Sequence, residues 1–327
     1  MLQSFREKAV CLLLGLALIA GLFATAAAAQ DQGQATPAKP AEAEEQKEGP
    51  PSTVGPIITD TAIPIEAHHL SMTLGFFPTF FPANTTSNWR QVSYGSNFFT
   101  LFMPLKITYG PMKDWETYIV VPYVQQWISG ANVPAPNGST SASYAGIGDI
   151  SWFNKYLLLE ETDSRPAVTG VFGVGFPSGH ASHLNPNLLN TDAIGTGSLA
   201  FTSGFDFFKY LKPLLFNANL WFTAPVNLYQ DRPDNVRSRD YVTFNLSAEY
   251  PLTKQWTALI EWFSDWSWTN ISTPQGYQSP YTYMGILPGL EYQLNDKWAF
   301  STGAAFYLAA KQGAIQYMPI LTMNYSF

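Results

Sequence analysis

Eight charged residues stand singly inside stretches where apolar and polar residues alternate, and they are the first candidates for chemistry. Two of them are cations and six are anions. A charge removed from water must be paired or hydrated. The set therefore predicts either ion pairs that brace neighbouring strands or an acidic, water-filled passage that disfavours anions, and both interpretations stay open. The residues, as lumen-lining candidates, are Lys106, Asp149, Lys155, Asp206, Glu249, Glu261, Asp265 and Glu291.

Aromatic side chains occupy the same alternating positions as these charges. One interpretation is packing, because rings can fill whatever interior space water does not. The other is an apolar track along which aromatic or hydrophobic solutes could pass. The residues concerned are Phe102, Phe153, Trp221, Tyr241, Phe263 and Tyr307.

The sequence offers little for catalysis. A serine hydrolase needs a nucleophile beside a histidine base, yet none of the four histidines lies mid-strand next to a serine, and no Gly-x-Ser-x-Gly elbow is present. His180 and His183 form a His-x-x-His pair that lacks the spacing and the adjacent carboxylate of a helical metal site. We therefore predict no catalytic residues, no metal site and no cofactor. An outer-membrane lipid-modifying enzyme is the least favoured alternative.

The chain begins with the pattern of a secretory signal peptide. Arg6 and Lys8 precede an apolar run over residues 9–24, and small alanines follow, which predicts a signal peptide of residues 1–29. A retained single-span anchor is the alternative, and the closing alanines argue against it. Cys11 is the only cysteine and lies in the apolar run. The mature chain is therefore predicted to contain no disulfide.

Residues 30–66 differ in composition from the rest of the chain. They are rich in proline and glutamate and show no periodicity before about Ile57. This composition predicts a disordered periplasmic linker. A second interpretation is that residues 54–66 enter the barrel and plug its lumen.

The elements that would carry the candidate side chains follow from a period of two. From His69 onward apolar and polar residues alternate, as Val242 and Phe244 do with Thr243 and Asn245. Such alternation predicts strands with one apolar and one polar face. The third segment is weak, because it is apolar on both faces. Twelve segments fit the pattern, at residues 69–79, 97–109, 116–127, 146–159, 166–177, 197–208, 214–225, 240–251, 255–268, 283–294, 298–309 and 315–327.

The connections between these segments alternate in length. All long loops then fall at one end of the strand array, which is the asymmetry of outer-membrane barrels. An even number of strands also places both termini on the periplasmic side. The short connections are at 110–115, 160–165, 209–213, 253–254 and 295–297, and the long ones at 81–96, 128–145, 178–196, 226–239 and 269–282.

Composition favours a membrane barrel over a soluble sandwich. Of 327 residues, 46% are hydrophobic and 15% aromatic but only 13% charged, about half the charge of an average soluble domain. A sandwich would leave one face wet and charged, whereas the apolar face predicted here carries almost no charge. The predicted fold class is therefore all-β. It is a transmembrane up-and-down antiparallel β-barrel of twelve strands, over residues 67–327.

The last segment ends on an aromatic residue. Met323, Tyr325 and Phe327 are in step along it. A terminal strand of this form resembles the signal that the barrel-assembly machinery recognises in outer-membrane proteins. We therefore predict that machinery as a partner, together with the lipid of the outer membrane.

Several motifs together resemble one family. A Gly-x-Gly-Asp strand start at 146–149 is followed by Lys-Tyr at 155–156 and by a glycine-rich strand ending in Phe-Pro-Ser-Gly at 176–179. The stretches 58–65 and 102–106 are two further motifs of this resemblance. The chain resembles the outer-membrane transporter family labelled as proteins of the meta-pathway of phenol degradation. The resemblance implies an outer-membrane channel for small organic molecules and supplies no functional residues to carry over.

These features predict a channel in the outer membrane of a Gram-negative cell. We expect passive transport of small, hydrophobic or aromatic organic molecules, with those solutes as partners. The net charge of −7 leaves no basic footprint for nucleic acid. A non-transporting structural or surface-binding barrel is the main alternative. The sequence leaves open the solute, the direction of transport and the oligomeric state.

Overall fold

The computed structural model describes residues 53–327, except 94, 229–238, 269–270, 274–275 and 279. The predicted signal peptide and residues 30–52 of the predicted linker lie outside the described residues. The chain divides into a unit of Met1–Gly49 and a unit of Pro50–Phe327. All described residues belong to the second unit.

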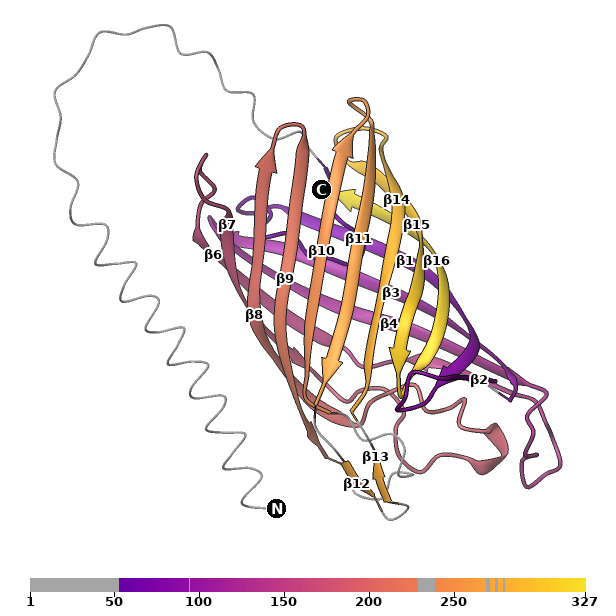
Figure 1. Cartoon of the computed structure of the whole chain (residues 1–327). Helices are drawn as coiled ribbons and strands as arrows, with labels where there is room; N and C mark the ends of the chain where they lie inside the picture. Colours follow the sequence, from indigo (N-terminus) through magenta and orange to yellow (C-terminus); the bar gives the residue numbers. More distant parts are fainter. Residues whose placement is uncertain (1–52, 94, 229–238, 269–270, 274–275, 279) are drawn as a thin grey trace, which may run out of the picture. The chain divides into compact units, whose positions relative to one another are not determined.

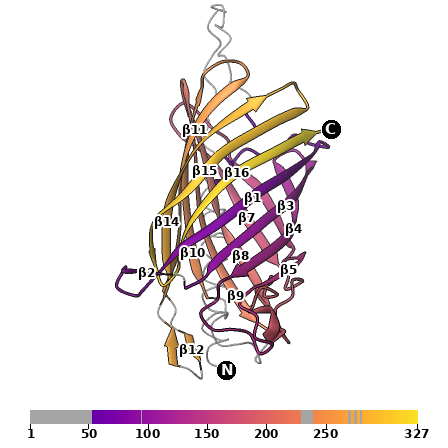
Figure 2. The same cartoon turned by 90° about the vertical axis from the view of Figure 1, so that its right-hand side faces the viewer.

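Twelve antiparallel strands form a closed wall, because β16 also pairs with β1 (Figures 1 and 2). Each strand otherwise pairs with its neighbours in the order of the wall. The alternation of the sequence thus predicts the wall correctly. Its strands are β1 (Leu70–Thr85), β3 (Asn97–Met112), β4 (Trp115–Ser129), β6 (Ser151–Leu159), β7 (Ala167–Gly175), β8 (Ser198–Leu211), β9 (Leu214–Asn227), β10 (Tyr241–Pro251), β11 (Trp256–Ser267), β14 (Thr282–Gln293), β15 (Trp298–Lys311) and β16 (Ala314–Ser326).

Five short elements lie at the end of the barrel that carries the long connections. β2 pairs with the end of β1, which is longer than predicted. β5 pairs only with β4, and β12 pairs with β13 in a separate hairpin, seen beyond the wall in Figure 1. The elements are β2 (Gln91–Ser93), β5 (Ala142–Ile147), the 3-10 turn η1 (Pro186–Leu188), β12 (Ile271–Thr273) and β13 (Gly276–Gln278).

The predicted strand at 146–159 is interrupted, which corrects the sequence-based boundary. β5 pairs with β4 up to Ile147, and β6 resumes at Ser151. Three residues, 148–150, stand opposite two residues of β4, so the strand bulges there. Pro122 of β4 lies at this point and has no N–H to donate to the ladder.

The pattern of buried and exposed residues along the strands is the reverse of the pattern in a soluble protein. In β10, Ser247 and Glu249 are 3% and 1% exposed, whereas Leu246 before them and Tyr250 after them are 42% and 46% exposed. Polar side chains therefore face the interior and apolar ones face outward, as a lipid solvent requires. Within the described residues no helix has the length and apolar character of a membrane span.

Candidate functional site

A stretch without regular secondary structure runs through the barrel before β1. We call residues 53–66 the interior segment. It packs apolar side chains on the wall, since Ile57 and Ile58 contact a cluster around Phe263 and Leu287, and Ala62 belongs to a second buried cluster. Its main-chain polar groups have no strand beside them, so each must find another partner in the interior.

Carboxylates of the wall supply many of those partners. Glu261 accepts hydrogen bonds from the main-chain N–H groups of Ile57 at 2.7 Å, Ile58 at 3.0 Å and Thr59 at 2.6 Å. Glu291 accepts one from Val54 at 2.7 Å. A hydrogen bond of this kind contributes about 0.5–1.5 kcal/mol net. These inward carboxylates therefore hold the interior segment in place.

Carbonyl groups of the segment are bound from the opposite wall. Lys155 donates to the carbonyl of Thr61, and Thr169 donates to that of Ala62. Asn219 binds Asp60 twice, accepting from its N–H at 2.7 Å and donating to its carbonyl at 2.8 Å. The amide side chain thus pairs with the main chain as a neighbouring strand would.

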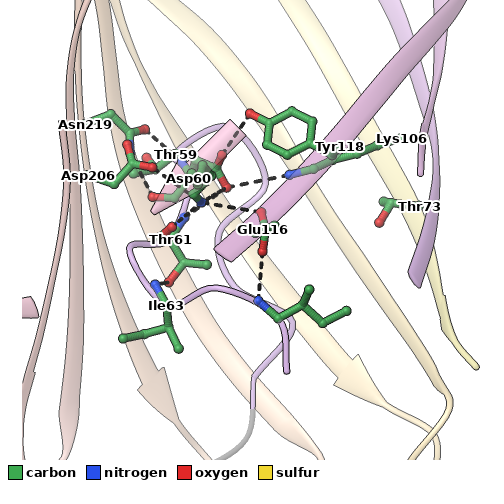
Figure 3. A network of polar contacts seen from close by, with 12 residues as sticks. Thr59, Asp60, Thr61, Ile63, Thr73, Lys106, Glu116, Tyr118, Asp206 and Asn219 are labelled. Carbon is green, nitrogen blue, oxygen red and sulfur yellow. Dashed lines mark hydrogen bonds and ion pairs between the residues drawn. The ribbon is translucent and has the colours of Figure 1, made fainter. Parts of the chain in front are cut away.

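Asp60 is the centre of an ion-pair network (Figure 3). Its carboxylate lies 3.6 Å from Lys106 and 3.2 Å from Lys155, and it accepts a hydrogen bond from Tyr118 at 3.0 Å. Burial alone would raise the pKa of the Asp60 carboxyl, but the two lysines outweigh burial and hold the pKa below its ordinary value. Asp60 is therefore ionised and joins the segment to β3, β4 and β6.

The network extends into the wall through Lys155, which is fully buried. Its ammonium lies 3.4 Å from Asp206 and 3.7 Å from Glu116. Glu116 also accepts a hydrogen bond from the N–H of Ile65 at 2.9 Å. Asp206 accepts from Asn219 as well. Most of the predicted interior charges are thus gathered around the interior segment.

A cavity of about 730 Å³ remains beside the segment, along β1, β3, β4 and β16. The Lys106 side chain is 31% exposed, while Asp206, Glu249, Glu261 and Glu291 are at most 1% exposed. Of these five residues, Lys106 therefore lines the cavity and the four carboxylates do not. Its lining combines hydroxyl, amide and aromatic groups, among them Ser71, Thr73, Phe77, Thr108, Tyr118, Phe153, Trp221, Ser301, Thr322 and Asn324.

The predicted aromatic residues occupy two regions of the interior. Phe153 and Trp221 lie by the segment with ring centres 5.7 Å apart, and Phe102 contacts Phe77 at 6.0 Å. The others lie towards the end with the long connections. There Phe263 contacts Tyr307, Tyr241 contacts Tyr281, and Asp265 accepts hydrogen bonds from Thr243 and Tyr283.

Asp149 has a different place from the other charged candidates. Its carboxylate accepts hydrogen bonds from the N–H of Gly179 at 2.9 Å and from the N–H of Thr196 at 2.6 Å. It lies in the break between β5 and β6, where the chain is not a strand. The assumption of continuous alternation therefore fails at this residue, which fastens the connection between β7 and β8.

Several residues of the network are absent from the sequence-based set. Glu116 and Tyr118 fall in the weak third segment, where both faces look apolar. Asn219 and Thr169 are uncharged, although their inward positions alternate in step with the predicted charges. Asp60 lies in the proline-rich stretch, where period-two alternation gives no signal.

The structure also shows where His180 and the C-terminal aromatic strand lie. His180 Nδ1 lies 3.0 Å from the carbonyl of Asp192, and in the described part of the chain no three His, Cys, Asp or Glu residues are grouped to hold a metal ion. Met323 and Tyr325 pair with β1, and the N–H of Phe327 donates to the carbonyl of Leu70 at 3.0 Å. The last residues thus complete the closure of the barrel.

Comparisons with known proteins identify the fold. No family model matches the chain, and no curated protein matches its sequence. An outer-membrane channel from Pseudomonas putida F1 matches with a TM-score of 0.60 and 11% identity, covering 84% of this chain and all of that one. The translocator domain of the autotransporter NalP from Neisseria meningitidis gives 0.45 at 9% identity, with 80% and 89% covered. The toluene transporter TodX of P. putida gives 0.40 at 8%, with 80% and 91% covered. The chain therefore has the fold of an outer-membrane β-barrel.

Proposed function

We propose that the protein is an outer-membrane channel for the passive transport of small organic molecules. The observation that carries the proposal is the cavity of about 730 Å³ between the interior segment and the wall. A cavity of this size can hold a small ligand, whereas a folded chain could not pass. The proposal requires no catalytic residue, cofactor or energy source.

The lining favours small hydrophobic or aromatic solutes with a polar group. Phe77, Phe153 and Trp221 offer ring faces, while Thr73 and Thr322 offer hydroxyls. Rings give apolar contact area, and hydroxyls can replace the water that a phenol or alcohol gives up on entry. We place the protein in the outer membrane with both termini in the periplasm, in accord with the apolar outer face of the wall.

The test is solute flux into liposomes that carry the purified, folded protein. Thr73→Trp should reduce the flux of a small phenol, because Thr73 lines the cavity. Leu74→Trp is the matched control, since Leu74 is the next residue and its exposed side chain lies on the outward face. Both variants should keep the heat-modifiable gel shift of a folded barrel.

The outcome separates a channel from a purely structural barrel. Flux no greater than that of empty liposomes would contradict transport by any route. Flux that is equal in wild type and Thr73→Trp would show that solutes do not use the cavity beside the interior segment.

A further inference from the structure

Two glycines on the inward face of the wall lie directly beside aromatic rings of the cavity. Gly173 of β7 stands opposite Phe153 of β6 in the strand ladder, and Gly75 lies two residues before Phe77 on β1. Both glycines are buried, while the rings of Phe77 and Phe153 are half-buried and line the cavity. Each glycine and its ring therefore share the inward face of the barrel.

The rings occupy the space that a side chain at either glycine would need. A Cβ atom at Gly173 would have three carbons of the Phe153 ring within 3.0 Å, and one at Gly75 would have two carbons of the Phe77 ring within that distance. Carbon atoms in favourable contact are about 3.5–4.0 Å apart. The absence of a side chain at Gly173 and Gly75 is therefore what lets these rings lie against the wall. We call these two positions the glycine seats.

Other inward glycines lack this relation to a single ring. A Cβ atom at Gly204 would meet the main-chain oxygen of Leu220, and one at Gly285 would meet that of Phe306. Substitutions at those positions would disturb the strand ladder itself. At the glycine seats the atom nearest to a Cβ belongs to a ring that lines the cavity.

Neighbouring rings limit where the Phe153 ring could move. Tyr118 stacks on it with ring centres 5.0 Å apart and planes 19° apart, and Trp221 lies 5.7 Å away. Both neighbours line the same cavity. A side chain at residue 173 would displace the ring by about 1 Å to restore ordinary contact distances. Since rings stand beside it along the wall, the open direction for this displacement is the cavity.

We propose that Gly173 and Gly75 determine the largest solute that the cavity admits, because they seat the rings of Phe153 and Phe77 against the wall. The inference rests on the proposed function, since it concerns solutes that pass through this cavity. Selectivity in a pore depends on its free diameter. An alanine at either glycine seat should therefore exclude large solutes before small ones.

The test compares the flux of phenol and of a naphthol into liposomes that carry the full mature chain. Gly173→Ala should lower the ratio of naphthol flux to phenol flux at least about threefold. Gly170→Ala is the matched control on the same strand, because the nearest atoms to a Cβ there belong to the Leu158 side chain, at 3.3 Å or more. Its flux ratio should equal that of wild type.

A second substitution separates a displaced ring from a damaged strand. Adding Phe153→Leu to Gly173→Ala should restore the flux ratio, because leucine has no ring to push into the cavity. A strand weakened by alanine would gain nothing from that change. Gly75→Ala with and without Phe77→Leu repeats the test on β1, so the inference stays testable where one variant loses the heat-modifiable gel shift of a folded barrel.

Each outcome has a distinct meaning. Wild-type flux with an unchanged ratio in both alanine variants overturns the inference and leaves the channel standing. A lowered ratio that neither leucine substitution restores also overturns it, because the loss then belongs to the strands. Absence of flux in wild type contradicts the channel itself, and this inference falls with it.

Discussion

Asp60 shows how one residue can fix a stretch without regular secondary structure inside a barrel. Its carboxylate meets Lys106, Lys155 and Tyr118 from three strands of the wall. Removing one partner from a buried ion pair costs about 3–5 kcal/mol, because the other charge is left uncompensated. Lys155 retains Asp206 and Glu116, so the loss here belongs at the lower end of that range.

Asp60→Asn should therefore reduce the free energy of unfolding by about 3 kcal/mol. The unfolding temperature of the barrel should fall accordingly. Glu66→Gln is the matched control, because Glu66 is the other acidic residue of the interior segment and its side chain is 84% exposed. Calorimetry of the detergent-folded proteins measures both. Equal unfolding temperatures for Asp60→Asn and wild type would show that the network does not stabilise the fold.

The pH dependence of this difference has a definite sign. A carboxyl with a lower pKa in the folded state contributes its stability above the unfolded pKa of about 3.9 and loses it as the pH falls through the folded value. The difference between wild type and Asp60→Asn should be constant between about pH 8 and pH 5 and should shrink in stronger acid. A difference that disappears already near pH 6 would contradict an ionised Asp60 held by lysines.

At the level of elements, the break between β5 and β6 organises the long connection beside it. Asp149 binds Gly179 and Thr196 at the two ends of that connection, and Ser178 accepts a hydrogen bond from the N–H of Ile150 at 2.8 Å. The connection is thus tied to the wall at its base. Asp149 therefore holds this connection against the wall through hydrogen bonds and is not part of the passage.

Asp149→Asn should loosen the connection while leaving the barrel closed. One amide oxygen cannot replace two carboxylate oxygens that accept from both Gly179 and Thr196. We expect faster protease cleavage within residues 178–196 and an unchanged heat-modifiable gel shift. Asp296→Asn, in the turn between β14 and β15, is the control and should cleave like wild type. Unchanged cleavage in Asp149→Asn would contradict the fastening role.

The elements also show what the sequence can and cannot predict. Strand positions follow from local alternation, and β10 and β16 match their predicted segments closely. The break at residues 148–150 does not follow, because Gly146 and Gly148 carry no side chain that marks a face, and Asp149 after them reads as one more alternating polar position. For the interior segment the sequence leaves two positions open, a periplasmic linker and a lumen plug. Glu261 binds it across 202–204 residues of sequence, and no local pattern encodes that contact.

For the whole molecule, the low charge of the sequence reflects a division between two surfaces. The outward face is apolar, and the interior collects carboxylates such as Glu116, Asp206, Glu249 and Glu261, all buried. A twelve-stranded wall with polar side chains inside would enclose an open, wet space. The interior segment fills part of that space and donates main-chain N–H groups to Glu116, Glu261 and Glu291.

Deleting residues 53–66 should therefore widen the passage without opening the wall, because β1 and β16 pair independently of the segment. The flux of small solutes into liposomes should rise at least about tenfold as the interior opens. The unfolding temperature should fall, since Glu261, Glu291 and Lys155 lose partners. Deleting residues 36–49, which removes the same length of chain, is the control and should leave both measurements unchanged. A folded 53–66 deletion with wild-type flux would show that the interior segment does not limit passage.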